Sequence, residues 1–234
     1  MDTHTASTLV MVNSAGERKF LHQLGASSEV FADPINFTSS IAEGMAHYHL
    51  ASLFLLPLLR LHAPESLERA RRAGLTTSLD TNWDPEGTWM VDLEPCLKHL
   101  NVLFLNEDEA RMVTGSSKPA TAARIVLDKG VEIAVMKLGA RGCAIYTSDQ
   151  EIICPAFAVD VKDTTGAGDC FVAGFLASMV RKASLAEAGN FANAVAALSV
   201  QKLGAVSGIP AYTQTQAWIR SAKLRSPDIT EVLR

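Results

Sequence analysis

Hydrophobic and polar positions follow one pattern at the start of the chain and another after it. Residues 8–13 and 18–25 are short apolar-alternating runs on either side of a glycine turn, which predicts two β segments. From residue 31 onward, short buried-type runs alternate with longer amphipathic ones. Expected strands include 76–82, a run ending near Leu105, and 131–139. Expected helices include 64–74, which has proline at its start and glycine at its end, a segment from Asn106, and 121–130.

This alternation predicts an α/β fold with a mostly parallel sheet flanked by helices. We expect a small β segment over residues 1–30 and one α/β domain over residues 31–234. The most apolar run, 50–59, is too short to span a bilayer and contains Pro57, so it is expected to lie in the core.

Composition narrows the possible partners. The 234 residues are 48% hydrophobic, enough for a sizeable core, and carry a net charge of −4. That balance offers no basic surface for nucleic acid, and the first ten residues lack the pattern of a signal peptide. The four cysteines are far apart in the sequence, which favours reduced thiols in a cytoplasmic protein and no membrane association.

Polar clusters follow the expected strands. They are Asp80 with Asn82, Asn106 to Glu109, Lys137 to Gly142, and Asp163 to Asp169. Because ligands of such folds bind at the carboxyl ends of the strands, we expect one crevice lined by all four. Each cluster alone is also typical of a turn or a helix cap.

The last cluster, DTTGAGD, precedes an apolar helical face. That face comprises Phe171, Val172, Phe175, Leu176, Met179 and Val180. The turn of Gly166, Ala167 and Gly168 therefore presents backbone N–H groups at a helix start, where an anion can approach closely. The alternative is a tight strand-to-helix turn in which Asp169 is a favourable acid of the first helical turn. The nucleotide-binding motif G-x-x-x-x-G-K-[ST] is absent from the sequence.

Four motifs in register resemble the ribokinase-like, or PfkB, carbohydrate kinase family. They are NEDE at 106–109, KLGARG at 137–142, DTTGAGD at 163–169, and the segment 191–210. The resemblance implies a ribokinase-like fold, with residues 1–30 as part of a β lid. It also implies that ATP phosphorylates a sugar hydroxyl, with Asp169 as general base and Gly166, Ala167 and Gly168 as the anion hole.

The resemblance further implies the ligand sites. Lys137, Gly139, Gly142, Thr165 and Asn193 are expected around the nucleotide. Asn106 and Glu109 are expected to organise Mg²⁺ through water, although the same pair is also typical of a helix cap. A K⁺ site of some family members corresponds here to Asp163, Thr165, Ser199, Lys202, Gly204 and Gly208, where Gly208 replaces a frequent serine.

Two departures from the family pattern leave alternatives open. Asp80-Thr81-Asn82 resembles a D-x-N-x-R segment without its arginine, and the N-terminal sugar-binding part of the family is missing from the sequence. The first interpretation is therefore a sugar kinase in shortened form, with a homodimer contact through the lid. The second is a nucleoside kinase of the same fold, and the third is a non-catalytic nucleotide-binding protein derived from a kinase.

Overall fold

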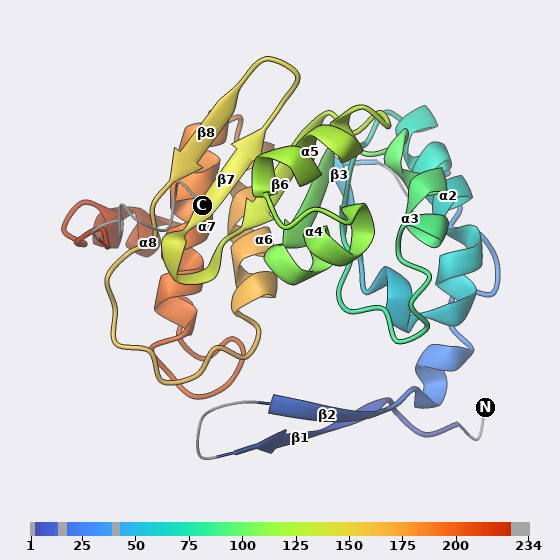
Figure 1. Cartoon of the computed structure of the whole chain (residues 1–234), viewed down its shortest axis with the longest axis horizontal. Coiled ribbons are helices and arrows are strands. Elements are labelled where there is room, and N and C mark those ends of the chain that lie inside the picture. Colours follow the sequence, from blue (N-terminus) through green and yellow to red (C-terminus); the bar gives the residue numbers. More distant parts are fainter. Residues whose placement is uncertain (1–2, 14–17, 39–42, 226–234) are drawn as a thin grey trace. The chain divides into compact units, whose positions relative to one another are not determined.

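The computed structural model describes residues 3–13, 18–38 and 43–225, which divide into two compact units, Met1–His99 and Leu100–Arg234 (Figure 1). The first unit contains β1 (Ser7–Val12), β2 (Arg18–Gln23), β3 (His47–Ala51), α2 (Pro57–Arg72), β4 (Thr76–Asp80) and α3 (Met90–Leu97). The second contains β5 (Val102–Asn106), α4 (Glu107–Thr114), α5 (Pro119–Leu127), β6 (Ile133–Lys137), β7 (Cys143–Tyr146), β8 (Glu151–Cys154), α6 (Ala167–Val180), α7 (Leu185–Ser199) and α8 (Tyr212–Ile219).

In the first unit, β1 and β2 form the predicted pair of β segments as a two-stranded antiparallel sheet. Every residue of β1 is exposed, and so are the large side chains of Phe20 and Leu21 on β2. The strands β3 and β4 pair in parallel, with Ala51 opposite Asp80. The small sheet is therefore separate in its hydrogen bonding from the parallel pair.

Helix α2 begins earlier than the sequence predicted. Pro57, not Pro64, is the first-turn proline, and Pro64 lies inside the helix. A proline can continue a helix when neighbouring contacts compensate for its missing N–H donor. The run 50–59 belongs mainly to the core as expected, because Leu50, Leu53, Phe54 and Leu59 are buried.

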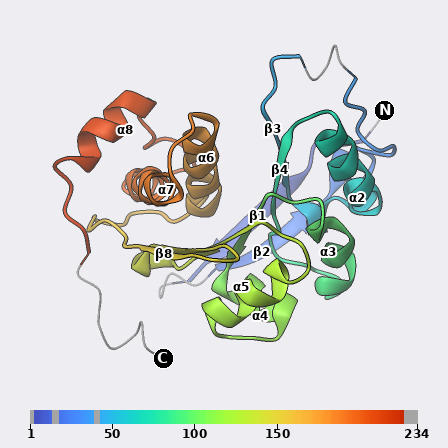
Figure 2. The same cartoon turned by 90° about the horizontal axis from the view of Figure 1, so that it is seen from above.

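In the second unit, β5 and β6 pair in parallel, whereas β7 pairs antiparallel with β6 and with β8. Helices α6 and α7 lie on one side of this layer, and α4 and α5 lie on the other (Figure 2). The side chains between the strands and the α6–α7 pair form one apolar cluster, which includes Phe104, Ile145, Phe171 and Phe175. Each buried side chain of this size stabilises the fold by about 1.5–3 kcal/mol.

The α/β fold class is confirmed, with a mostly parallel six-stranded sheet, flanking helices and the separate two-stranded sheet. The predicted apolar face of α6 is confirmed for Phe171, Val172 and Phe175, but Val180 is exposed because it lies at the end of the helix. All four cysteines are free and buried. Within the described ranges, no helix combines the length and apolar character needed to cross a membrane.

Candidate active site at the start of helix α6

The DTTGAGD turn leads directly into α6. Gly166 is the N-cap residue and has a left-handed backbone with φ of 72°. A Cβ atom at this position would lie 2.8 Å from the Cβ atom of Ala205, so both the conformation and the space favour glycine. Asp169 occupies the first turn of the helix and is exposed. The turn therefore presents a carboxylate beside a positive helix end.

The backbone N–H groups of the turn differ in their contacts. The Ala167 N–H donates to the carbonyl oxygen of Thr164 at 3.2 Å. The Gly168 N–H lies in the first helical turn, where an α-helix offers no acceptor of its own. An anion bound at this turn would be a suitable acceptor for the Gly168 N–H.

Asp163 joins this turn to the loop after α7. Its Oδ1 atom accepts hydrogen bonds from the Thr165 N–H at 2.9 Å and from the Thr165 hydroxyl at 2.7 Å. Its Oδ2 atom accepts the Gly204 N–H at 3.0 Å. Next to Gly204, the carbonyl oxygen of Ala205 accepts a hydrogen bond from the Cys170 thiol at 3.2 Å. One carboxylate thus fixes the relative position of two loops beside Asp169.

The thiol beside Asp169 remains protonated at neutral pH. Burial raises the pKa of Cys170, and the charge of Asp169 raises it further, while a hydrogen bond with Ser199 acts in the opposite direction. Cys170 therefore adds no negative charge next to the candidate base.

Lys137 brings a positive charge to the same turn. It is the last residue of β6, and its Nζ atom lies 3.7 Å from the point where a Cβ atom would stand on Gly168. An ammonium group at this distance from a helix start creates a site that favours phosphate.

A cavity of about 280 Å³ adjoins the turn and lies entirely within the second unit. Six of the predicted site residues line it, namely Lys137, Gly139, Gly142, Ala167, Gly168 and Asn193. The remaining wall is mainly apolar and includes Phe157, Val159, Val161 and Val200. A mostly apolar cavity with few convergent polar groups is typical of small-molecule sites.

The turn between β6 and β7 shapes one side of this cavity. Gly139 and Gly142 both have positive φ, and a Cβ atom on Gly142 would lie 2.6 Å from the Ala156 nitrogen. Arg141 of the same turn forms an ion pair with Glu107 at the start of α4. The ion pair connects the KLGARG segment to the NEDE segment.

Asn193 is 6% exposed and holds the cavity wall together. Its side-chain nitrogen donates to the carbonyl oxygens of Cys154 at 2.9 Å and Pro155 at 3.2 Å. Both donors of the amide thus fasten α7 to the segment that leaves β8.

Asn106 and Glu109 form the helix cap that the sequence offered as an alternative. The Asn106 Oδ1 atom accepts the Glu109 N–H, and the Glu109 Oε2 atom accepts the Asn106 N–H, each at 2.8 Å. These contacts occupy one oxygen of each side chain, so the pair fits the water shell of Mg²⁺ better than direct coordination. Asn106 also lies opposite Lys137 in the parallel pairing of β5 with β6.

The remaining residues of the expected K⁺ site lie at and after the end of α7. The Ser199 hydroxyl donates to the Ala196 carbonyl oxygen at 2.8 Å, and the Lys202 N–H donates to the Ser199 carbonyl oxygen at 3.4 Å. Gly208 packs against the backbone of Leu198 so closely that a side chain there would overlap it. The serine typical of this position would therefore not fit this backbone.

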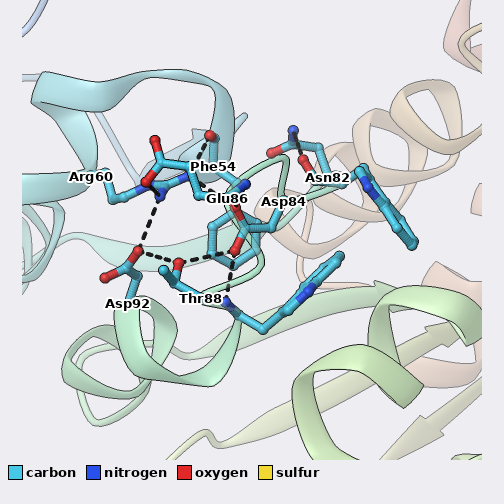
Figure 3. A network of polar contacts seen from close by, with 9 residues as sticks. Phe54, Arg60, Asn82, Asp84, Glu86, Thr88 and Asp92 are labelled. Carbon is cyan, nitrogen blue, oxygen red and sulfur yellow. Dashed lines mark hydrogen bonds and ion pairs between the residues drawn. The ribbon is translucent and has the colours of Figure 1, made fainter. Parts of the chain in front are cut away.

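The segment Asp80-Thr81-Asn82 belongs to the first unit and ends β4. Asp84 stands where the family pattern has arginine, and it pairs with Arg60 of α2 at 3.2 Å (Figure 3). Arg60 also pairs with Glu86 and Asp92. The position that carries arginine in the family pattern is thus a carboxylate here, and it pairs with an arginine of α2.

The ion pair between Arg60 and Asp84 stabilises the loop after β4. Burial alone would raise the pKa of Asp84, but N–H donors of Trp89 and Glu86, the Thr88 hydroxyl and Arg60 together hold it below its usual value. Asp84 therefore stays ionised and keeps the loop closed around it.

The sequence analysis missed several residues of the cavity. Phe157, Val159, Val161 and Arg225 line the cavity but belong to no motif. The apolar ones are typical core residues in sequence, and Arg225 lies far from every predicted strand end. Only the three-dimensional structure brings them to the glycine turns.

The chain is similar to known kinases over most of its length. It is 32% identical to a ribokinase from Mus musculus over 219 residues, covering 89% of this chain and 65% of that protein. It is 29% identical to an uncharacterized sugar kinase from Archaeoglobus fulgidus over 211 residues, covering 88% of this chain and 80% of the relative.

Solved structures show the same fold. A putative ribokinase II from E. coli in complex with ATP and Mg²⁺ has a TM-score of 0.79 and 24% identity, covering 94% of this chain and 72% of that one. Arabidopsis thaliana ribokinase with ribose and ATP also has a TM-score of 0.79 and 24% identity, covering 94% and 70%. The expected ribokinase-like fold is thereby confirmed. The family model described as pfkB family carbohydrate kinase matches residues 1–212. The chain therefore belongs to the pfkB family of carbohydrate kinases.

Proposed function

We propose that this protein transfers the γ-phosphoryl group of ATP to a hydroxyl group of a sugar, and that the second unit holds the nucleotide. The observation that carries this proposal is the position of Lys137. Its ammonium group lies beside Gly168 at the start of α6, on the wall of the cavity that the glycine turns also line. A cation, a helix start and an apolar cavity together suit a nucleotide better than an uncharged ligand.

The nucleoside part of ATP would occupy the apolar region of the cavity, near Phe157 and Asn193. The phosphates would extend toward Lys137 and Gly168, where positive charge is concentrated. Asn193 acts in this proposal mainly by holding the wall, because its amide nitrogen already donates to Cys154 and Pro155. At Gly139 a side chain would stand in open space, so glycine there allows close approach of the nucleotide to the backbone, whereas Gly142 lets the turn pack on Ala156.

Asp169 would act as the general base. The acceptor hydroxyl loses its proton to the Asp169 carboxylate while its oxygen forms a bond to the γ-phosphorus and the bond to ADP breaks. Lys137 and the N–H groups of Gly166, Ala167 and Gly168 would stabilise the charge on the transferring group. Ala167, Gly168 and Asp169 all lie in the first turn of α6, so the base and part of the anion site belong to the same helix.

Two ions belong to this proposal. Magnesium, held through its waters by Asn106 and Glu109, would neutralise phosphate charge when bound. A K⁺ ion near Asp163 and Thr165 would further order this turn and the loop that contains Gly204. The Asp163 carboxylate already connects the two by accepting three hydrogen bonds.

The test is acceptor-dependent ADP formation. Purified protein with ATP and Mg²⁺ is assayed separately with hexoses, pentoses, sugar acids and nucleosides. A reaction without any acceptor gives the background of ADP formation. We expect ADP release to rise with at least one sugar. Nucleotide binding by titration calorimetry without any acceptor-dependent ADP release would contradict the kinase function and favour a nucleotide-binding role.

A further inference from the structure

The segment after α8 forms part of the cavity wall. Leu224 bridges Phe157 in an antiparallel manner. The Ala158 N–H donates to the Lys223 carbonyl oxygen at 2.9 Å, and the Arg225 N–H donates to the Ala156 carbonyl oxygen at 2.7 Å. Trp218 of α8 packs against Phe157, with ring centroids 5.0 Å apart. Residues 223–225 are thus held against residues 156–158 by an isolated antiparallel bridge.

This pairing brings Arg225 to the cavity. Among the residues that line it, Lys137 and Arg225 are the two that carry charge, and both charges are positive. Lys137 lies beside Gly168, at the phosphate side of the proposed site. The backbone N–H of Arg225 is hydrogen-bonded to the carbonyl oxygen of Ala156, a residue that packs closely on Gly142, so Arg225 enters the cavity wall from that segment.

The Arg225 side of the cavity has the character of a nucleoside site. Asn193 fastens Cys154 and Pro155, immediately before Ala156. Phe157 and Val159 supply apolar surface close by. A guanidinium group is planar, weakly hydrated and able to stack on an aromatic ring, whereas an ammonium group lacks this geometry. The base of a nucleotide offers such a ring.

We propose that Arg225 binds the nucleoside part of the nucleotide, with its guanidinium stacked on the base. The proposal rests on the proposed function, because it assumes that the cavity holds ATP. Arg225 lies beyond residues 1–212, the part that the family model matches, so the family resemblance assigns it no role. Arg225 is in this proposal a nucleotide-binding residue outside the region that the family model matches.

The test compares three variants by titration calorimetry with adenosine, ADP and ATP. Arg225→Ala removes the guanidinium, Arg225→Lys keeps the charge without the planar group, and Lys223→Ala removes one positive charge from a residue of the same segment that is not among those lining the cavity. All three changes are at exposed positions, so thermal unfolding should show intact folding.

We expect both Arg225 variants to weaken adenosine, ADP and ATP by a similar factor of about three- to tenfold, and Lys223→Ala to bind like the original protein. If Arg225→Ala binds adenosine, ADP and ATP with unchanged affinity, the proposal is wrong. It is also wrong if Arg225→Lys retains affinity while Arg225→Ala weakens ATP far more than adenosine, because that pattern indicates phosphate attraction. Failure of the unaltered protein to bind any nucleotide would instead contradict the proposed function.

Discussion

Replacing Asp163 with alanine tests whether one carboxylate holds the phosphate turn in place. The change removes the acceptor of three hydrogen bonds, two from Thr165 and one from Gly204. Hydrogen bonds to a charged group contribute about 1.5–3 kcal/mol each when they are well shielded from water. Because Asp163 is only partly buried, water replaces much of this, and we expect the free energy of unfolding to fall by about 2 kcal/mol.

The assay combines thermal unfolding with ATP titration. For a chain of this length, about 2 kcal/mol corresponds to a fall in Tm of about 4–8 °C. We also expect weaker ATP binding, because the loops on either side of Gly166 lose their connection. Asp160→Ala is the matched control, since it removes an exposed carboxylate three residues earlier. Equal Tm values and equal ATP affinities for the two variants would show that Asp163 does not hold the turn in place.

Two further changes probe other parts of the fold. Gly166→Ala should lower the free energy of unfolding by about 2–4 kcal/mol, because it adds backbone strain and overlap with Ala205. Gly115 has a similar φ of 76° but open space around it, so Gly115→Ala should lower the free energy of unfolding by about 1–3 kcal/mol less than Gly166→Ala does. Equal losses for the two variants in denaturant unfolding would exclude the overlap with Ala205. Burial, and secondarily the charge of His49, lowers the pKa of His47 to about 4 from 6.5, so the folded state binds fewer protons than the unfolded state between these values. The free energy of unfolding should therefore rise with pH from about 4 to 6.5, by about 1–2 kcal/mol after allowing for solvent screening, and His47→Gln should flatten this rise in urea titrations. An unchanged slope would show that other groups cause it.

The elements that sequence predicted best are those with strong local signals. The apolar periodicity and the glycine turn predicted α6, and the reciprocal Asn106–Glu109 contacts match the predicted helix cap. The predicted start of α2 was wrong because the sequence pattern favours Pro64 as the first-turn proline, whereas the helix begins at Pro57 and continues through Pro64. The hairpin of β7 and β8 was not anticipated, since its two four-residue strands are too short to give a periodic signal.

Some residues of the candidate site also had local sequence signatures, whereas others did not. Lys137, Gly139, Gly142 and Gly168 could be proposed because glycine turns and strand ends have sequence signatures, and they do line one cavity. The ion pair of Asp84 with Arg60 could not be predicted from the sequence, because it joins side chains 24 positions apart. Arg225 likewise depends on a bridge between Phe157 and Leu224. Long-range contacts of this kind leave no local pattern.

The substitution Asp169→Asn, measured through turnover and ATP affinity together, decides whether Asp169 is the general base. The substitution keeps the shape of the side chain and removes its basicity. We expect kcat to fall by about 10²–10⁴-fold, whereas the Kd for ATP is nearly unchanged. Asp160→Asn, the matched control, should leave both unchanged. A fall in kcat of less than threefold, or a loss of activity fully explained by lost ATP binding, would contradict the assignment of Asp169 as the general base.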